Sequence, residues 1–302
     1  MASTKEIKNH INSVKDTQKI TNAMYLISST KLQKAKRELD HTRPFFNYTQ
    51  KEIKRIFRRA PDLQSHYFYP SKEEEPLNGT YGCLLITADK GLAGAYNLNV
   101  IKKAEELLEK HKDTKLFVVG EYGRRYFMKR NIPIEQSFLY TAVNPTMDRA
   151  REISSILLNL YDKGELEKIY VVYTDMENSI EEEARVFRLL PFHRFEFMKE
   201  DEIETDFEFA PSLKEVLESL MPSYIAGFIY SALVDSFCSE QNARMIAMNS
   251  ANQNAEKILS QLKMEYNRVR QAQITQEITE ISAGAKAQRD KRKKKEAQNE
   301  HR

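Results

Sequence analysis

The apolar positions near the N-terminus recur with the spacing of a helix that packs along one face. From Ile7 to Leu39 they alternate steps of four and three residues, the heptad spacing of a coiled-coil seam. Polar residues dilute this seam at Gln18, Thr21 and Ser28. The periodicity is therefore equally consistent with a broad stripe that faces a protein core.

We expect this helix to begin at Ser3 or Thr4, because Ser3 and Glu6 have the spacing of a capping box. Pro44 is expected to bend or interrupt the helix, since proline lacks the backbone donor that a helix interior needs. Apolar residues at positions 53, 56 and 57 predict that the helix resumes beyond the proline.

The middle of the chain follows a different pattern. Three short, continuous apolar runs predict buried strands at residues 83–86, 116–119 and 169–173. Helical patterns occupy residues 100–108, 122–128 and 147–160, and further candidate strands lie at 186–191 and 195–197. Because continuous apolar strands that alternate with helices form mainly parallel sheets, we expect an α/β domain with helices on both faces of its sheet.

Helix breakers are absent from most of the C-terminal part. The last proline is Pro222, and after Gly227 the only glycine is Gly284, so positions 228–283 contain neither residue. Proline and glycine are the residues that interrupt or weaken a helix. The sequence therefore predicts a long helix at each end of the chain, with a globular domain inserted between them.

The two terminal helices differ in length. Ser212 is a suitable N-cap for the second one, of which ~60 residues would span roughly 90 Å. The first, with ~40 residues, would reach only about 60 Å. If the two pair antiparallel, the C-terminal end runs on alone. An isolated helix gains little stability by itself, so that end requires an external partner.

Composition narrows the class of protein. The 302 residues are 41% hydrophobic and 30% charged, and the net charge of +3 gives no overall field for nucleic acid. Residues 289–295 nevertheless form a basic run. The most apolar stretch, 224–234, is well short of the ~20 residues that span a bilayer. The N-terminus has no apolar signal core and no transit-peptide composition, so we expect a cytoplasmic chain without a transmembrane segment.

Candidate catalytic and metal-binding patterns are weak. Cys83 and Cys238 lack the spacing of a zinc or redox motif, and we expect two buried free thiols. The six histidines show no metal-ligand spacing. Residues 89–97 follow a predicted strand and precede a helix, where α/β folds bind phosphate. They hold only a Gly-x-x-Gly pair, however, and a structural turn is the favoured interpretation.

The stretch at residues 266–281 is unusually polar for a helix of this kind. Within it, Arg270, Gln271, Thr275 and Glu277 would form a hydrogen-bonding face at the unpaired end of the C-terminal helix. The alternative is a solvated face, which is the usual role of such charge patterns. The residues alone favour that alternative.

Four separated motifs resemble one family. They are SVKDTQKITNAM at 13–24, DKGLAGAYN at 89–97, SEQNARMIAM at 239–248 and YNRVRQAQITQEITEI at 266–281. In this order and spacing they are similar to the signatures of the gamma subunit of bacterial F-type ATP synthase. Ala93 stands where a cysteine is common in that family, and no regulatory cysteine insert of the chloroplast kind is present.

The resemblance implies a fold and a function. The fold would be an antiparallel left-handed coiled coil of the two terminal helices with an inserted Rossmann-like α/β domain. The chain would be the rotor of the central stalk, without catalytic residues, cofactor or metal of its own. Its partners would be the hexamer of alpha and beta subunits, the epsilon subunit and the membrane c-ring. It would lie, as one peripheral copy, at the cytoplasmic face of the bacterial cell membrane.

The resemblance also implies roles for individual residues. A contact set for the beta catch region falls on Arg270, Gln271, Thr275 and Glu277, with Arg270 as the donor to a beta carboxylate. Met24 and Arg244 match positions that couple the shaft to the hexamer. The isoleucines of the tip would turn inside an apolar sleeve, and they are Ile274, Ile278 and Ile281.

The predicted domain organisation follows from these patterns. It comprises a coiled-coil helix at 1–60, a linker at 61–80, an α/β domain at 81–200, a linker at 201–211, a coiled-coil helix at 212–287 and a disordered basic tail at 288–302. The tail extends past the family pattern, and we expect it either to aid solubility or to modulate rotation or assembly. Without the resemblance, a coiled-coil adaptor carrying an α/β binding module would be the leading alternative.

Overall fold

The computed structural model of the chain describes residues 3–60, 63–69, 79–176, 182–193 and 210–300, without the side chains of Leu39, Glu182 and residues 290–300. The chain divides into two compact units. One unit joins Met1–Met24 to Met248–Arg302, and the other comprises Tyr25–Ala247. The candidate strand at 195–197 lies outside the described residues.

The first helix, α1, covers Thr4–Arg59 and begins as the sequence predicts. The backbone N–H of Ser3 donates to Glu6 Oε2 at 2.8 Å, and that of Glu6 donates to Ser3 Oγ at 3.2 Å. This reciprocal pair is a capping box, which satisfies two donors that the first helical turn leaves free.

Helix α1 continues through Pro44, so the predicted interruption of the helix is wrong. Tertiary packing just beyond the proline explains the difference. The Phe46 ring stacks on Tyr224 with centroids 5.1 Å apart, and Gly227 leaves room for it, since a Cβ there would lie 2.8 Å from the Phe46 ring. Ile53 and Phe57, about two and three turns after Phe46, are fully buried. Such burial outweighs the cost of one missing helical donor.

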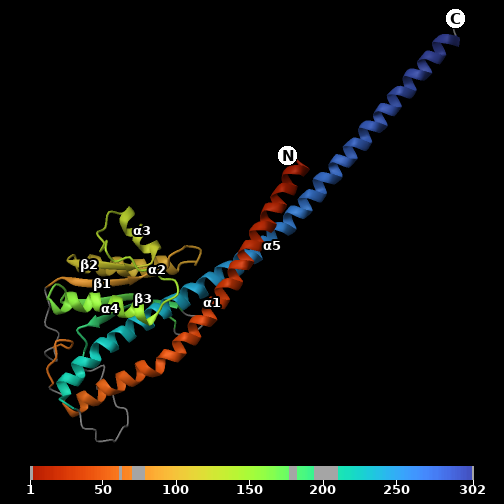
Figure 1. Cartoon of the computed structure of the whole chain (residues 1–302). Helices are drawn as coiled ribbons and strands as arrows, with labels where there is room; N and C mark the ends of the chain where they lie inside the picture. Colours follow the sequence, from red (N-terminus) through yellow and green to blue (C-terminus); the bar gives the residue numbers. More distant parts are fainter. Residues whose placement is uncertain (1–2, 61–62, 70–78, 177–181, 194–209, 301–302) are drawn as a thin grey trace. The chain divides into compact units, whose positions relative to one another are not determined.

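The sheet has the order β2-β1-β3-β4 (Figure 1). Its strands are β1 (Tyr81–Ile86), β2 (Thr114–Val119), β3 (Lys168–Met176) and β4 (Glu182–Leu190). Strand β1 pairs in parallel with β2 and β3, whereas β4 pairs antiparallel with β3. The three predicted strands and the mainly parallel sheet are confirmed, and β4 adds an antiparallel edge.

Helices cover both faces of the sheet, as expected for strands that are apolar on both sides (Figure 1). They are α2 (Tyr96–Lys110), α3 (Glu121–Lys129) and α4 (Met147–Asp162). Alternate residues of β1 enter different cores. Leu84 and Ile86 pack with residues of α1, α4 and α5, while Cys83 and Leu85 pack with residues of α2.

The last helix, α5, covers Leu213–Glu300. Ser212 caps it, since the backbone N–H of Glu215 donates to Ser212 Oγ at 3.2 Å. Where the sequence predicts a disordered tail from residue 288, the structure continues the helix to Glu300. Lysine, arginine and glutamate are good helix formers, and no glycine or proline follows Gly284.

Within the unit formed by the two chain ends, α1 and α5 lie side by side and antiparallel (Figure 1). Ile7, Ala255 and Leu259 are buried in their contact. The polar seam position Thr21 has a specific partner, because its hydroxyl donates to Asn252 Oδ1. Helix α5 continues beyond the start of α1 (Figure 1), which agrees with the predicted difference in helix length.

Among the described helices, α5 is the one long and apolar enough, by length and composition, to cross a membrane. The qualifying window of this helix is 56% buried inside the protein. Burial of that kind is also usual for a core helix.

Candidate functional site

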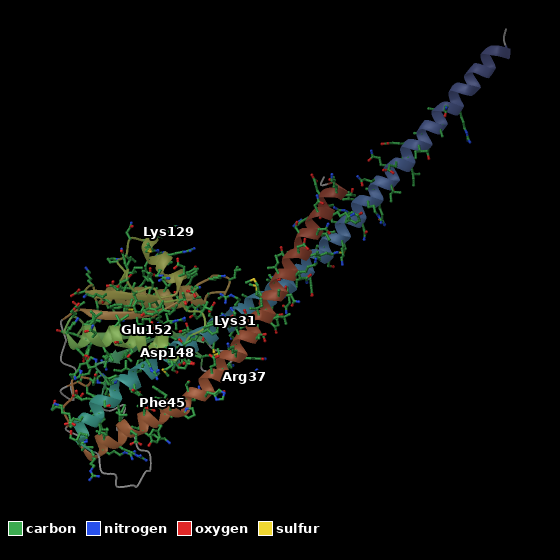
Figure 2. The ribbon with its side chains drawn as sticks, viewed as in Figure 1. Lys31, Arg37, Phe45, Lys129, Asp148 and Glu152 are labelled. Carbon is green, nitrogen blue, oxygen red and sulfur yellow. The ribbon has the colours of Figure 1, made fainter. Side chains whose placement is uncertain are left out.

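The terminal part of α5 does not pack against any other described part of the chain. Val269 is still half-buried, whereas every residue from Arg270 to Arg289 is exposed. We call residues 270–289 the tip, and Figure 2 shows side chains on several sides of this part of the helix. The tip carries apolar residues all the same. Ile274, Ile278 and Ile281 are 46%, 59% and 71% exposed.

The predicted partner-contact residues share one side of the tip. Successive residues of an α-helix are about 100° apart, so Ile274, Ile278 and Ile281 fall within a stripe about 60° wide. Arg270 and Glu277 flank this stripe on one side, while Gln271 and Thr275 flank it on the other. The result is an apolar stripe between two polar margins, an arrangement suited to binding another protein. The opposite side lacks large apolar residues and carries Ala272, Gln276 and Ala283.

Some polar groups of the tip form hydrogen bonds within the helix. The Thr275 hydroxyl donates to the Gln271 carbonyl at 2.9 Å, and the Gln276 amide donates to Glu280 at 2.9 Å. Met24, the predicted coupling residue on α1, is half-buried near the boundary between the two units.

Arg244 is the most buried of the predicted site residues. The resemblance matches it to a position that couples the shaft to the hexamer, and in the structure its side chain is 9% exposed and bonds within the chain. Its guanidinium forms an ion pair with Glu240 at 2.5 Å, one helical turn earlier. It also donates to the carbonyls of Gly91 at 3.0 Å and Lys90 at 3.4 Å.

Arg244 therefore joins two of the sequence motifs, the turn at 89–97 and the helical segment at 239–248. We call this contact the clasp and define it by Lys90, Gly91, Glu240 and Arg244. The turn is further held by Asn97, which accepts from the backbone N–H of Ala88 at 2.9 Å. The carbonyls of this turn serve internal bonds, which supports its interpretation as a structural turn.

Glu240 illustrates the electrostatics of the clasp. Burial raises the pKa of its carboxyl group, and the neighbouring Arg244 opposes that shift. The Gln241 side chain donates to Glu240 at 3.1 Å and satisfies a further lone pair. A buried ion pair of this kind needs both partners, because either charge left alone would be strongly disfavoured.

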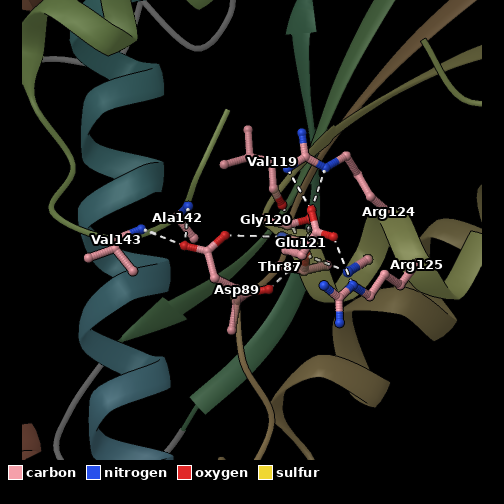
Figure 3. A network of polar contacts seen from close by, with 11 residues as sticks. Thr87, Asp89, Val119, Gly120, Glu121, Arg124, Arg125, Ala142 and Val143 are labelled. Carbon is pink, nitrogen blue, oxygen red and sulfur yellow. Dashed lines mark hydrogen bonds and ion pairs between the residues drawn. The ribbon is translucent and has the colours of Figure 1, made fainter. Parts of the chain in front are cut away.

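Asp89, the first residue of the same turn, organises the edge of the sheet beside the clasp (Figure 3). One carboxylate oxygen accepts from the backbone N–H of Glu121 at 3.0 Å, at the start of α3. The other accepts from those of Ala142 and Val143, both at 3.1 Å. A negative side chain at a helix N-terminus is favourable, so Asp89 fixes α3 and the loop before α4 together.

At this edge of the sheet, the backbone at Gly120 lies very close to the backbone at Thr87. The Thr87 hydroxyl donates to the Val119 carbonyl at 2.9 Å and accepts from the Gly123 N–H at 3.1 Å (Figure 3). Gly120, between β2 and α3, has φ of 95°. A Cβ on it would lie 2.2 Å from the Thr87 carbonyl oxygen, so the turn requires glycine.

Glu121 carries the charged part of this network. It forms ion pairs at 2.8 Å with both Arg124 and Arg125 (Figure 3). Hydrogen bonds from these two arginines hold the pKa of Glu121 below its usual value. The sequence analysis singled out neither Asp89 nor Glu240, although a carboxylate three residues after a buried strand is a signal that could have pointed to Asp89. Among the described residues, no group of three or more His, Cys, Asp or Glu could hold a metal ion.

Comparison with known proteins identifies the family. A family model described as ATP synthase matches residues 3–288. The ATP synthase gamma chain of Caldanaerobacter subterraneus subsp. tengcongensis is 44% identical and covers 93% of this chain and 98% of its own length. The sodium ion specific ATP synthase gamma chain of Acetobacterium woodii is 34% identical, and the match covers 93% of this chain and 97% of that one.

The fold has counterparts among solved structures. A chain of the Euglena gracilis mitochondrial ATP synthase rotor matches with a TM-score of 0.64 at 14% identity, covering 90% of this chain and 98% of its own. A chain from the central stalk and c-ring structure of Tetrahymena thermophila mitochondrial ATP synthase matches with a TM-score of 0.56 at 22% identity. The match covers 77% of this chain and 99% of that one. The class of protein is thus a subunit with two long terminal helices and an inserted α/β domain. The chain belongs to the ATP synthase gamma chain family, and so is a subunit of an ATPase complex.

Proposed function

We propose that this chain is the rotating shaft of an F-type ATP synthase and that it carries no catalytic residues itself. Its partners would be the alpha and beta subunits, the epsilon subunit and the membrane c-ring. One copy would lie at the cytoplasmic face of the bacterial membrane. The observation that carries the proposal is the exposed tip of α5, which has an apolar stripe with polar margins on one side, in a chain of this family.

The asymmetry of the tip supplies a mechanism. Inside a three-fold hexamer, a helix with one distinct side would face each beta subunit differently at any moment. A shaft can change the nucleotide affinity of a site only if it contacts the open and closed states of that site with different free energies. The isoleucine stripe and its polar margins provide such a difference, because the opposite side of the helix lacks them.

Specific roles follow for the margins. Arg270 would donate charge-assisted hydrogen bonds to a beta carboxylate, which are about twice as strong as neutral ones. Gln271, Thr275 and Glu277 would complete the polar contacts of the catch region. Ile274, Ile278 and Ile281 would turn against an apolar sleeve. Met24 would meet the beta subunit from α1, whereas Arg244 would act on the hexamer through the turn that it holds.

The test is co-expression of the full chain with alpha and beta subunits, followed by purification and single-molecule rotation. We expect one copy of the chain per hexamer and ATP-driven rotation. Arg270→Ala should lower the torque, and it should lower the hydrolysis rate by about tenfold, the loss of ~1.4 kcal/mol of a charge-assisted contact. Gln276→Ala, on the opposite side of the tip, is the matched control and should rotate as the wild type does.

Two outcomes would reject the proposal. One is failure of the full chain to join the alpha and beta subunits while remaining a stable, soluble monomer, which would favour an adaptor protein. The other is equal loss of rotation in the two variants, which would remove the asymmetry argument.

A further inference from the structure

The paired parts of α1 and α5 share one repeating pattern of covered side chains. Within the unit formed by the two chain ends, the half-buried and buried residues of α1 recur every three or four positions, and apart from Ala251 so do those of α5. This is the heptad spacing of a coiled-coil seam. The covered residues are Thr4, Ile7, Ile11, Val14, Gln18, Thr21 and Met24 on α1, and Met248, Ala251, Asn252, Ala255, Leu259, Leu262, Tyr266 and Val269 on α5.

The contact between Thr21 and Asn252 gives the register of this seam. The Thr21 hydroxyl donates to Asn252 Oδ1, so these two residues face each other across the antiparallel pair (Figure 1). One heptad towards the start of α1 therefore faces one heptad towards the end of α5, and Val14 lies opposite Leu259. The last covered residues of the seam, Thr4 and Val269, are equally far from the polar contact, which agrees with this register.

This register decides where the tip begins. Val269 faces Thr4, the first helical residue of α1, and every residue from Arg270 to Arg289 is exposed. A shift of α5 along α1 by one heptad would change the free length of the tip by about 10 Å. In one direction, the shift would bring Arg270 and Gln271 alongside α1 and withdraw them from a partner. The height of the predicted contact residues therefore depends on the register.

The apolar residues of the seam do not select one register. Most of its positions are apolar, so a shift by one heptad would again pair apolar residues. The polar pair distinguishes the registers. After a shift, Thr21 would face Leu259, or Asn252 would face Val14, and a covered polar group would lose its hydrogen bond. A polar residue at a single seam position specifies the register of a coiled coil in this way, at a cost in stability.

We propose that Thr21 and Asn252 are positioning residues, which fix the register of α1 and α5 and thereby hold the contact residues of the tip at one height. Their role rests on the proposed rotor function, in which the tip reaches a partner subunit. Two residues outside the tip would then control how far it projects. They should lower the stability of the seam while they make its pairing unique.

The test places reporter cysteines in the seam of the full chain. Ile11→Cys faces Leu262→Cys in the observed register. After a shift by one heptad it would face Val269→Cys in one direction and Ala255→Cys in the other. Residues that face each other across the seam are close enough to form a disulfide, whereas residues one heptad apart are not. The two native cysteines are buried and should not compete.

Three backgrounds are compared with the wild type for each reporter pair. The apolar background, Thr21→Val with Asn252→Leu, removes the polar pair. The swapped background, Thr21→Asn with Asn252→Thr, keeps a polar pair with its members exchanged. Gln18→Leu is the matched control, because it makes another covered seam position apolar and leaves the polar pair in place.

We expect the wild type, the swapped background and the control to crosslink through Leu262→Cys alone. In the apolar background, crosslinks through Val269→Cys or Ala255→Cys should rise by about tenfold, because the shifted registers no longer leave a polar group without its partner. The same background should resist urea better than the wild type, since its seam is apolar throughout this contact. In the assembled complex, however, a smaller fraction of its molecules should rotate. A merely structural role for the pair would not combine higher stability with poorer rotation.

Two results would overturn the inference. An unchanged crosslinking pattern in the apolar background would show that the rest of the chain sets the register without this pair. Shifted crosslinks with normal rotation would show that the register does not control the contacts of the tip. The crosslinking experiment needs no partner subunit. Failure of the wild-type chain to assemble with alpha and beta subunits would therefore count against the rotor function, and is distinguishable from failure of the register.

Discussion

Two regions of the same helix, α5, have opposite relations to the rest of the chain. The segment from Leu217 to Arg244 is mostly buried, although it contains both Pro222 and Gly227. The tip, residues 270–289, is wholly exposed, and Gly284 is its only helix-weakening residue. Helical continuity therefore says little about stability. Tertiary packing stabilises the first region, whereas no other described residue covers the second, which gains little stability by itself.

The difference assigns separate tasks to the two regions. Residues buried in the first region hold α1, the sheet and α5 together, so their replacement should unfold the chain. Residues of the tip make few contacts that support the fold, and their replacement should affect assembly and rotation only. The expected effects below run from the largest to the smallest.

Truncation of one buried and one exposed isoleucine should show most clearly that the two regions of α5 contribute differently to stability. Ile229 is fully buried in the core between α5 and the sheet. Ile229→Ala should lower the free energy of unfolding by about 3 kcal/mol, the usual cost of such a cavity. Ile278→Ala at the tip is the matched control and should change it by less than ~0.5 kcal/mol. Urea denaturation of the full chain measures both, and equal losses would contradict the comparison.

Breaking the clasp should have an effect of similar size. Arg244→Met leaves the buried Glu240 carboxylate without its cation and frees the Gly91 carbonyl. The expected loss is about 3 kcal/mol, because an uncompensated buried charge remains. The double variant with Glu240→Gln removes that charge and should recover part of the stability. If the double variant were less stable than Arg244→Met, the ion pair would not be the cause.

The raised pKa of Asp235, a residue of the buried region, predicts that the free energy of unfolding depends on pH. Burial, and secondarily the charge of Asp175, raise the pKa of Asp235 from 3.8 to about 6. Arg185 holds Asp175 in an ion pair at 2.6 Å, and the Ser231 hydroxyl donates to Asp235 at 3.3 Å. Between pH 4 and 6 the folded chain keeps this proton while the unfolded chain releases it. The stability contributed by the protonated form is therefore lost as pH rises through that window.

The substitution Asp235→Asn should remove this loss. At pH 7 we expect the variant to be about 2 kcal/mol more stable than the wild type, and at pH 4 the two should be equal. Asp148→Asn, at an exposed carboxyl group on α4, is the control and should leave the pH profile unchanged. Denaturation midpoints between pH 4 and 8 test this, and a wild-type profile in Asp235→Asn would refute it.

A pair of glycine substitutions gives the smallest but sharpest contrast. Gly284→Ala meets nothing within 4 Å and should stabilise the helix of the tip by about 0.5–1 kcal/mol. Gly227→Ala places a Cβ 2.8 Å from the Phe46 ring and should destabilise the fold by about 1–3 kcal/mol. Hydrogen exchange of tip amides measures the first effect, and thermal unfolding the second. The same sign in both variants would be unexpected.

Much of the fold follows from local patterns in the sequence. The capping box at Ser3 and Glu6, the cap at Ser212 and the three apolar strands depend on neighbours in the chain, and each is confirmed. The passage of α1 through Pro44 was not predictable in this way. It depends on Phe46 packing over Gly227, a residue that lies far away in the sequence.

The candidate site shows the same distinction between features set by chain neighbours and features set by distant residues. The residues on each side of the tip could be predicted from helical spacing, because none of the described residues from distant parts of the chain covers them. The clasp could not, since Arg244 finds its carbonyl acceptors in a turn more than 150 positions earlier. Asp89 was likewise known only as part of a motif, and its three backbone donors come from two separate segments.

The two cysteines offer a practical use of this architecture. Cys83 and Cys238 are both almost completely buried, and burial raises the pKa of each thiol to about 12. Thiol reagents attack the thiolate, so the native chain should react very slowly with maleimides. A fluorophore could therefore be attached to a single cysteine introduced on the tip, as in Thr275→Cys, without removing the native ones. The native pair would then serve as an internal reporter, because it becomes labelled only when the buried region opens.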